Sequence, residues 1–144
     1  MNLEEINITI IGQGYVGLPL GVEFGKKYKT TGFDININRI NELKKGIDHT
    51  NEVTNKEIKK AKKLRFTSNL NDIKDSNIYI VTVPTPIDEF KTPNLSPLKK
   101  ASQMVGKILK KGDVIVYEST VFPGCTEEVC VPILQKTSNL IYNK

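Results

Sequence analysis

The sequence has little of what metal centres and membrane spans need. It contains two cysteines, Cys125 and Cys130, and one histidine, His49, which lies far from both along the chain. This spacing fits no recognisable zinc motif, so we expect no metal site. The longest apolar stretches, such as Ile6–Ile11, have the length of a strand and not of a membrane helix. Residues Met1–Glu5 are acidic where a secretory signal would be basic, which predicts a cytoplasmic protein with no membrane partner.

The two cysteines are interpreted as small, partly buried thiols, because a structural disulfide is not expected in a cytoplasmic protein. Cys125 follows Gly124 near an expected helix start, where the helix dipole could lower the pKa of the thiol. We therefore expect Cys125 to be somewhat reactive toward alkylating agents, with no catalytic role for either cysteine.

The composition is typical of one folded domain. Of the 144 residues, 38% are hydrophobic and 26% are charged, which excludes a disordered, collagen-like or membrane protein. The length allows one domain with a proper core and is short for two. We expect residues 1–144 to form a single domain.

The net charge of +5 raises the question of nucleic-acid binding, above all at the lysine-rich run Lys56–Arg65. Within it Ile58, Ala61 and Leu64 recur at a spacing of three, so the lysines are expected on the solvated side of a short amphipathic helix. No aromatic residue interleaves them as a platform for base stacking. We expect no nucleic-acid partner.

Strands and helices alternate along the chain. Apolar, β-branched runs predict strands at Ile6–Ile11, Thr30–Ile35, Arg65–Thr67, Ile78–Val83 and Val114–Tyr117. Helical spacing predicts helices at Tyr15–Lys27, from about Ile40 to Gly46, at Leu70–Lys74, from Pro97 to about Gly112 with Ser96 as its cap, and after Gly124. Such alternation is typical of parallel βαβ units with right-handed crossovers. The fold class is therefore α/β, a doubly wound parallel sheet in three αβα layers.

Glycines form a stripe on the first of these helices. Gly17, Gly21 and Gly25 repeat at intervals of four, and each costs a helix about 1 kcal/mol relative to alanine. Three aligned glycines indicate a face that lies close against the sheet. Pro19, inside the same helix, has no local explanation.

The first strand leads into a glycine-rich loop with the sequence Gly12-Gln13-Gly14-Tyr15-Val16-Gly17, which fits G-x-G-x-x-G. Alone the pattern is weak, but here it opens a helix and is followed by Asp34, about 20 residues on, at the end of the next strand. Gly12 permits the tight turn, Gly14 lets a pyrophosphate approach the backbone, and Gly17 allows close packing. The helix N-terminus offers free N–H groups to the phosphates. The pattern predicts a Rossmann dinucleotide site.

The cofactor is expected to be NAD and not NADP. Asp34 can accept hydrogen bonds from both ribose hydroxyls of the adenosine, and its charge would repel a 2′-phosphate. Arg39, five residues on, is expected to pack beside the adenine.

Two further loops should reach the same crevice, because the carboxyl ends of parallel strands meet at one edge of the sheet. Pro84 and Thr85 follow the fourth strand, and Glu118, Ser119 and Thr120 follow the fifth. They offer carbonyls, a carboxylate and hydroxyls. For Ser119, contact with ligand and a hydrogen bond to local backbone are equally plausible.

Several separated motifs in this order resemble the UDP-glucose/GDP-mannose dehydrogenase family. They are Ile11–Leu20, Gly32–Asn36 with Arg39 and Ile40, Val83–Pro86 and Glu118–Gly124, and the family pattern includes Pro19. Within the family the chain is most similar to the UDP-N-acetylglucosamine and UDP-N-acetylgalactosamine 6-dehydrogenases of bacterial surface-polysaccharide pathways. The resemblance implies oxidation of a sugar C6 alcohol to a carboxylate with two NAD, through an aldehyde and a cysteine-bound thioester.

The resemblance also implies where the chemistry lies. The expected cofactor contacts are Gly12, Gln13, Gly14, Tyr15, Val16, Gly17, Asp34, Arg39, Pro84, Thr85, Glu118 and Thr120. Thr120 is similar to the family threonine that helps to hold a water near the reaction centre. Several parts of the family's enzymes would lie beyond Lys144: the nucleophilic cysteine, the glutamate, lysine and asparagine, the central helix and the sugar-binding domain. The chain is therefore expected to be the N-terminal part of a longer enzyme, with its sheet cut after the fifth or sixth strand. That enzyme is expected to bind a UDP-sugar and to form a homodimer or higher oligomer.

Two alternatives stay open. The chain could belong to another NAD-dependent dehydrogenase with the same opening unit, of the 3-hydroxyacyl-CoA or 6-phosphogluconate type. It could also be a stand-alone NAD-sensing module with no chemistry of its own. The loops at Val83–Pro86 and Glu118–Thr120 argue against the first alternative.

Overall fold

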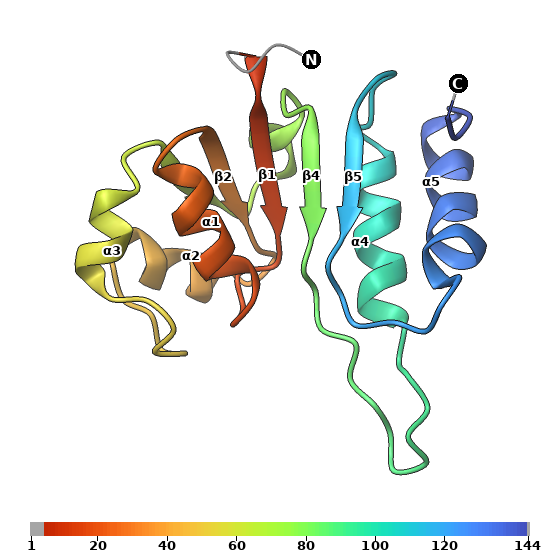
Figure 1. Cartoon of the computed structure of the whole chain (residues 1–144), viewed down its shortest axis with the longest axis horizontal. Coiled ribbons are helices and arrows are strands. Elements are labelled where there is room, and N and C mark those ends of the chain that lie inside the picture. Colours follow the sequence, from red (N-terminus) through yellow and green to blue (C-terminus); the bar gives the residue numbers. More distant parts are fainter. Residues whose placement is uncertain (1–4, 144) are drawn as a thin grey trace.

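The fold is one parallel sheet with helices on both faces (Figure 1), and the structure, a computed structural model, describes residues 5–143. The strands are β1 (Asn7–Ile11), β2 (Lys29–Phe33), β3 (Leu64–Thr67), β4 (Ile78–Val81) and β5 (Val114–Tyr117). The helices are α1 (Gly17–Gly25), α2 (Ile37–Lys44), α3 (Asn55–Lys60), the 3-10 helix η2 (Leu70–Ile73), α4 (Ser96–Gly106), the π-helical turn η3 (Thr126–Cys130) and α5 (Val131–Ser138).

The strand order is β3-β2-β1-β4-β5, with every neighbouring pair parallel. The chain first moves outward from β1 to β3, and then crosses to the other side of β1 and moves outward again through β4 and β5. This reversal confirms the predicted doubly wound sheet. The carboxyl ends of all five strands point to one edge, downward in Figure 1, and the reversal between β1 and β4 marks the place where such sheets bind ligands.

The two faces of the sheet bury separate cores, because successive strand residues point to opposite faces. Ile11 and Val81 pack with Leu98 of α4 and Leu134 of α5 on one face. The other face is covered over β2 and β3 by a cluster built from α1, α2 and the chain around α3: Leu18, Val22, Leu43 and Ala61. Near-continuous burial of β1 and β4 is typical of a parallel sheet covered on both sides.

The glycine stripe of α1 lies against the sheet, as predicted. A Cβ added to Gly17 would stand 1.9 Å from the carbonyl oxygen of Gly12, and one added to Gly25 would stand 2.6 Å from the Cβ of Leu64. At Gly21 the nearest atoms are 3.7 Å away, an ordinary contact. The close approach is therefore obligatory at the two ends of the helix and not at its middle.

The boundaries of α4 differ from the prediction. Ser96 is the first helical residue and not the cap; the cap position is Leu95, and the side-chain oxygen of Asn94 accepts from the N–H of Ser96. The helix ends at Gly106 and not near Gly112; residues 107–108 form a turn, and the chain turns again at Gly112, where φ is +91°, before β5. Ile108 continues the apolar spacing of the helix because it packs against the core, although it lies beyond the end of the helix.

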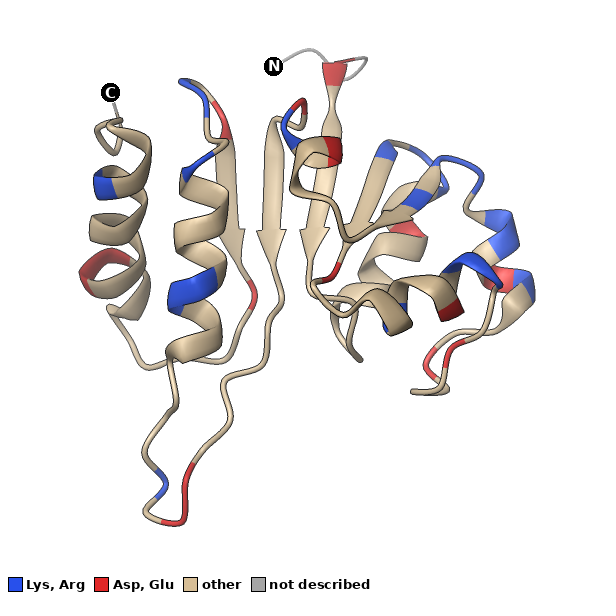
Figure 2. Cartoon of the chain, turned by 180° about the vertical axis from the view of Figure 1, so that it is seen from behind, with Lys and Arg blue, Asp and Glu red and all other residues tan. Residues whose placement is uncertain are grey.

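The lysine-rich segment is solvated, as predicted, but its helix is shorter than expected: α3 ends at Lys60, and Leu64 belongs to β3. Thr54 and Glu57 cap α3 reciprocally, Ala61 is buried, and the lysines point outward. In Figure 2 the basic residues around α3 gather at the right-hand end of the molecule. Separately, no helix within residues 5–143 is both long and apolar enough to cross a membrane.

Candidate cofactor-binding site

The glycine-rich loop crosses the carboxyl end of the sheet between β1 and α1. Gly12 has a φ of +97°, which side chains rarely adopt, and its N–H donates to the carbonyl of Phe33 at 2.8 Å. The helix begins at Gly17 with Val16 at the cap position and with no side chain capping it. The first N–H groups of α1 therefore remain available to a ligand.

Thr82, directly after β4, fastens this loop to the sheet. Its hydroxyl lies 3.0 Å from the carbonyl oxygen of Ile11 and 2.9 Å from that of Gly12, and a Cβ on Gly17 would stand 2.4 Å from it. The contact joins the ends of β1 and β4 at the reversal of strand order. The sequence did not single out Thr82, because it lies within the predicted strand Ile78–Val83 and carries no motif of its own.

The loop has the shape that a pyrophosphate needs. A Cβ added to Gly14 would meet no atom within 4 Å. Among residues 5–143, the backbone N–H groups of Gly14, Tyr15 and Val16 have no protein acceptor. Open space beside unpaired N–H groups, at the positive end of a helix dipole, is the arrangement that binds phosphate oxygens. The residues present thus fit the phosphates of a dinucleotide.

Asp34 stands at the end of β2, next to the loop, and is half-buried. Its Oδ2 accepts the N–H of Gln13 at 2.8 Å, and its Oδ1 accepts the N–H of Asn36 at 2.9 Å. Each carboxylate oxygen can accept further hydrogen bonds, so the pair of ribose hydroxyls expected from the sequence can be accommodated.

Arg39 is held inside the protein and not displayed at the surface. Its side chain is 5% exposed; Nε lies 2.8 Å from the carbonyl oxygen of Gln13, and Nη2 lies 2.8 Å from Oδ1 of Asp48. Nη1 contacts His49, which in turn pairs with Glu42. The expected packing of Arg39 beside the adenine stays a prediction, whereas its hold on the glycine loop was not expected from the sequence.

The loops after β4 and β5 are tied to each other. The hydroxyl of Thr85 donates to the carbonyl of Thr120 at 2.6 Å, and the hydroxyl of Ser119 donates to the carbonyl of Val83 at 2.6 Å. Ser119 thus donates to backbone, but to a carbonyl 36 residues away in the neighbouring loop and not to the local backbone that the sequence suggested. Pro84, Glu118 and Thr120 are exposed at this edge.

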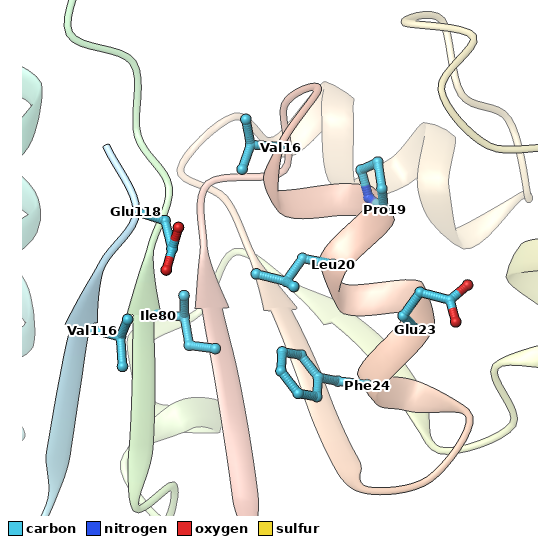
Figure 3. Close-up of a pocket in the computed structure, with 8 residues that line it drawn as sticks. All are labelled: Val16, Pro19, Leu20, Glu23, Phe24, Ile80, Val116 and Glu118. Carbon is cyan, nitrogen blue, oxygen red and sulfur yellow. The ribbon is translucent and has the colours of Figure 1, made fainter. Parts of the chain in front are cut away.

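A shallow groove of about 610 Å³ begins beside the glycine loop and runs along α1 (Figure 3). Val16, Leu20 and Phe24 form its wall on α1, and Ile80 of β4 and Val116 of β5 line the sheet side. Figure 3 shows the carboxylate of Glu118 at the end nearest Val16 and that of Glu23 on α1, so the groove is apolar with carboxylates at its edges. An apolar groove with a few charged groups at its edges can bury the apolar part of a ligand or of another segment of protein.

The cysteines are fully buried, which corrects the expectation of a reactive Cys125. Both are 0% exposed, in the core that lies between the sheet and helices α4 and α5. Burial, together with the neighbouring Cys130, raises the pKa of the Cys125 thiol, and burial also raises that of Cys130. The helix-dipole argument failed because desolvation in the core outweighs it. No group of three or more potential metal ligands is present within residues 5–143.

We predict that iodoacetamide modifies neither Cys125 nor Cys130 in the folded chain at neutral pH. A thiolate is the reactive form, and a raised pKa leaves less of it at any given pH while burial blocks the reagent. Mass spectrometry should show two modified cysteines only after unfolding in guanidinium. Rapid modification of the folded chain at pH 7 would contradict the burial of these thiols.

Comparison with known proteins places this geometry in a family. The model of the UDP-glucose/GDP-mannose dehydrogenase family, NAD binding domain, matches residues 6–143. The chain is 58% identical to a UDP-N-acetyl-D-glucosamine 6-dehydrogenase of Pseudomonas aeruginosa over 99% of this chain and 34% of that protein. It is 52% identical to Protein CapL of Staphylococcus aureus over 96% of this chain and 32% of that protein.

Solved structures agree with the sequence relatives. The UDP-D-ManNAc dehydrogenase of Pyrococcus horikoshii superimposes with a TM-score of 0.89 at 31% identity, covering 96% of this chain and 34% of that one. The chain therefore spans about a third of the length of the relatives it matches. With its five-stranded sheet, its glycine loop and a family match over nearly its whole length, the chain belongs to the UDP-glucose/GDP-mannose dehydrogenase family and corresponds to its NAD-binding domain.

Proposed function

We propose that NAD lies along the carboxyl edge of the sheet, with its pyrophosphate over the glycine loop and its adenosine ribose at Asp34. The observation that carries this placement is the 2.8 Å hydrogen bond from the N–H of Gln13 to Asp34, which fixes the carboxylate beside the loop. The proposed contacts are Gly12, Gln13, Gly14, Tyr15, Val16, Gly17, Asp34, Arg39, Pro84, Thr85, Glu118 and Thr120.

We further propose that residues 1–144 are the NAD-binding domain of a nucleotide-sugar 6-dehydrogenase, whose remaining length supplies a central helix and a sugar-binding domain. The site would hold two NAD molecules in turn, and each would take one hydride equivalent as the C6 alcohol is oxidised through an aldehyde to a carboxylate. The names of the relatives favour a UDP-N-acetylhexosamine as substrate. Thr120, exposed at the edge of the site, would help to hold a water there.

A panel of substrates tests this proposal against its rivals. The full-length protein would be assayed for NADH formation with UDP-N-acetylglucosamine, UDP-N-acetylgalactosamine, UDP-glucose, a 3-hydroxyacyl-CoA and 6-phosphogluconate. Turnover with a UDP-sugar supports the proposal. Turnover with either of the last two substrates identifies another dehydrogenase, and binding of NAD without turnover of any of them identifies a sensing module.

Three further proposals concern the cellular location of the enzyme, its lack of a nucleic-acid partner and its oligomeric state. We propose a cytoplasmic enzyme, where unpaired, buried thiols such as Cys125 and Cys130 persist in reduced form. The solvated lysines around α3 are proposed to keep the surface hydrated and not to bind nucleic acid. Light scattering of the full-length protein would test the proposed homodimer or higher oligomer.

We predict that the chain binds NAD about 100-fold more tightly than NADP, because placing a 2′-phosphate against the Asp34 carboxylate sets like charges side by side. Calorimetry with both cofactors measures the ratio. Asp34→Ala should weaken NAD binding, because the acceptor for the ribose hydroxyls is lost, and should strengthen NADP binding, because the repulsion of the 2′-phosphate is lost, so that the preference largely disappears.

Asp34→Asn is the matched control for this prediction, because the amide keeps the size of the side chain and one oxygen for the N–H of Gln13. It should lose most of the repulsion while retaining part of the NAD affinity. Equal affinities for the two cofactors in the unmodified chain, or an unchanged preference in Asp34→Ala, would show that Asp34 does not face the ribose.

A further inference from the structure

Asp48 is a buried carboxylate in the segment after α2, outside every motif described above. Its side chain is 0% exposed, and its Oδ1 lies 2.8 Å from Nη2 of Arg39. Oδ1 also accepts from the N–H and hydroxyl of Thr50, and Oδ2 accepts from the N–H groups of Glu52 and Val53. Burial alone would raise the pKa of Asp48, but these hydrogen bonds outweigh it and hold the pKa well below its usual range. Asp48 is therefore a fixed negative charge at neutral pH.

Arg39 connects this charge to the glycine loop. Its guanidinium donates to Asp48 through Nη2 and to the carbonyl of Gln13 through Nε, each at 2.8 Å. A planar guanidinium can make both contacts at once because its N–H groups form a rigid fork. Asp48 is the buried ion-pair partner of the guanidinium, whereas its other acidic neighbour, Glu42, lies 4.0 Å away and is partly exposed. Asp48 therefore contributes most of the charge that orients Arg39, and Arg39 holds the carbonyl of Gln13.

The direction of this carbonyl also determines the direction of the next backbone N–H group, that of Gly14. The carbonyl of Gln13 and the N–H of Gly14 belong to one planar trans peptide unit, so the two groups point in opposite directions. With the carbonyl turned toward Arg39, the N–H of Gly14 points away from it. Gly14 is also the position where an added Cβ would have no atom within 4 Å. The side chain of Gln13 is separately anchored to the carbonyl of Ile10, which fixes the residue but not the rotation of this peptide.

We propose that Asp48 is a positioning residue for cofactor binding: through Arg39 it orients the Gln13–Gly14 peptide so that the N–H of Gly14 faces the pyrophosphate. Asp48 itself touches no ligand. The inference rests on the proposed placement of NAD on the glycine loop. The proposal predicts that a change at Asp48 alters the affinity for the phosphate groups and not the affinity for the adenosine.

The test compares ligands with and without phosphate. Asp48→Asn should bind ADP about tenfold more weakly than the unmodified chain does, because a charge-assisted contact no longer orders the N–H of Gly14. The variant should bind adenosine with an affinity within about twofold of that of the unmodified chain. Titrations followed by amide NMR give both constants, and the Gly14 amide should shift less on addition of ADP. Asp113→Asn is the matched control, because Asp113 is also buried, with 4% of its side chain exposed, but pairs with Lys110 in the turn before β5. It should leave both constants unchanged.

A second pair of measurements separates positioning from folding. The double variant Arg39→Lys, Asp48→Asn should bind ADP within about twofold of the single variant Arg39→Lys. The guanidinium through which Asp48 acts is already absent in the single variant, so the second substitution has little left to remove. If Asp48→Asn does not fold, Thr50→Val replaces it, since this variant removes one donor to Asp48 and should weaken ADP binding about threefold.

Two results would overturn the inference: equal weakening of ADP and adenosine, or ADP binding that is unchanged in the folded variant. Either leaves the proposed function intact as long as the unmodified chain binds NAD. An unmodified chain that binds neither NAD nor ADP would overturn both proposals together.

Discussion

The 144 residues by themselves are expected to produce no NADH from any nucleotide sugar, even when they fold and bind NAD. Oxidation of an alcohol needs a base within hydrogen-bond reach of the hydroxyl, and the second oxidation needs a thiolate to trap the aldehyde. Cys125 and Cys130 cannot supply that thiolate, because both are buried and their pKa values are raised. Thr120 can orient a water but is too weakly acidic to replace either group.

Positioning of the substrate is the second reason for the expected inactivity. The groove along α1 is open to solvent on one side, and the charged groups that line it are the carboxylates of Glu23 and Glu118. A UDP-sugar would be neither oriented nor shielded from water there, which forfeits much of the roughly 7–11 kcal/mol that orientation can contribute to a reaction.

The assay follows the absorbance of NADH with UDP-N-acetylglucosamine, UDP-N-acetylgalactosamine and UDP-glucose in turn. The full-length Pseudomonas aeruginosa relative, named for the first substrate, serves as the positive control. Sustained turnover by the 144 residues would mean that the nucleophile lies within them, and would refute the proposed division of the enzyme into domains.

Gly17→Ala is expected to be the most damaging single substitution in the cofactor loop. The new Cβ would stand 1.9 Å from the carbonyl oxygen of Gly12 and 2.4 Å from the hydroxyl of Thr82. The first of these atoms is backbone, held by the turn at Gly12, so it cannot move aside as the end of a flexible side chain could. We expect a loss of about 3 kcal/mol or more of unfolding free energy, and a fall in melting temperature of about 10 °C. Thermal unfolding followed by circular dichroism measures both.

Two other glycines provide matched controls for Gly17→Ala. Gly21→Ala, in the same helix, meets its nearest atoms at 3.7 Å and should raise stability by up to about 1 kcal/mol, because alanine is the better helix former. Gly14→Ala should leave stability unchanged but weaken NAD binding, because its Cβ would occupy the open space meant for the pyrophosphate. If Gly17→Ala were as stable as Gly21→Ala, the close approach of α1 to the sheet would not exist in solution.

The sequence by itself determined the elements whose signals are local. Five apolar, β-branched runs predicted the five strands to within a few residues, and alternation with helices predicted the doubly wound order. The glycine spacing predicted both the tight turn at Gly12 and the face of α1 that packs on the sheet. These predictions succeeded because the position of Gly12 and the spacing of glycines in a helix dictate backbone geometry whatever the distant chain does.

Only the tertiary structure decided which side chains serve the site. Asp48 lies in a polar stretch with no motif, and its role depends on Arg39, Thr50 and a carbonyl of the distant glycine loop. The burial of Cys125 and the hydrogen bond of Ser119 to Val83 were likewise invisible locally. Arg39 meets the carbonyl of Gln13 across 26 residues of sequence, and Ser119 meets that of Val83 across 36. Cys125 is buried in a core that strands and helices build together. The free energy of a buried charge, thiol or hydroxyl depends on such partners and on the loss of water around it, and both arise only in the folded chain.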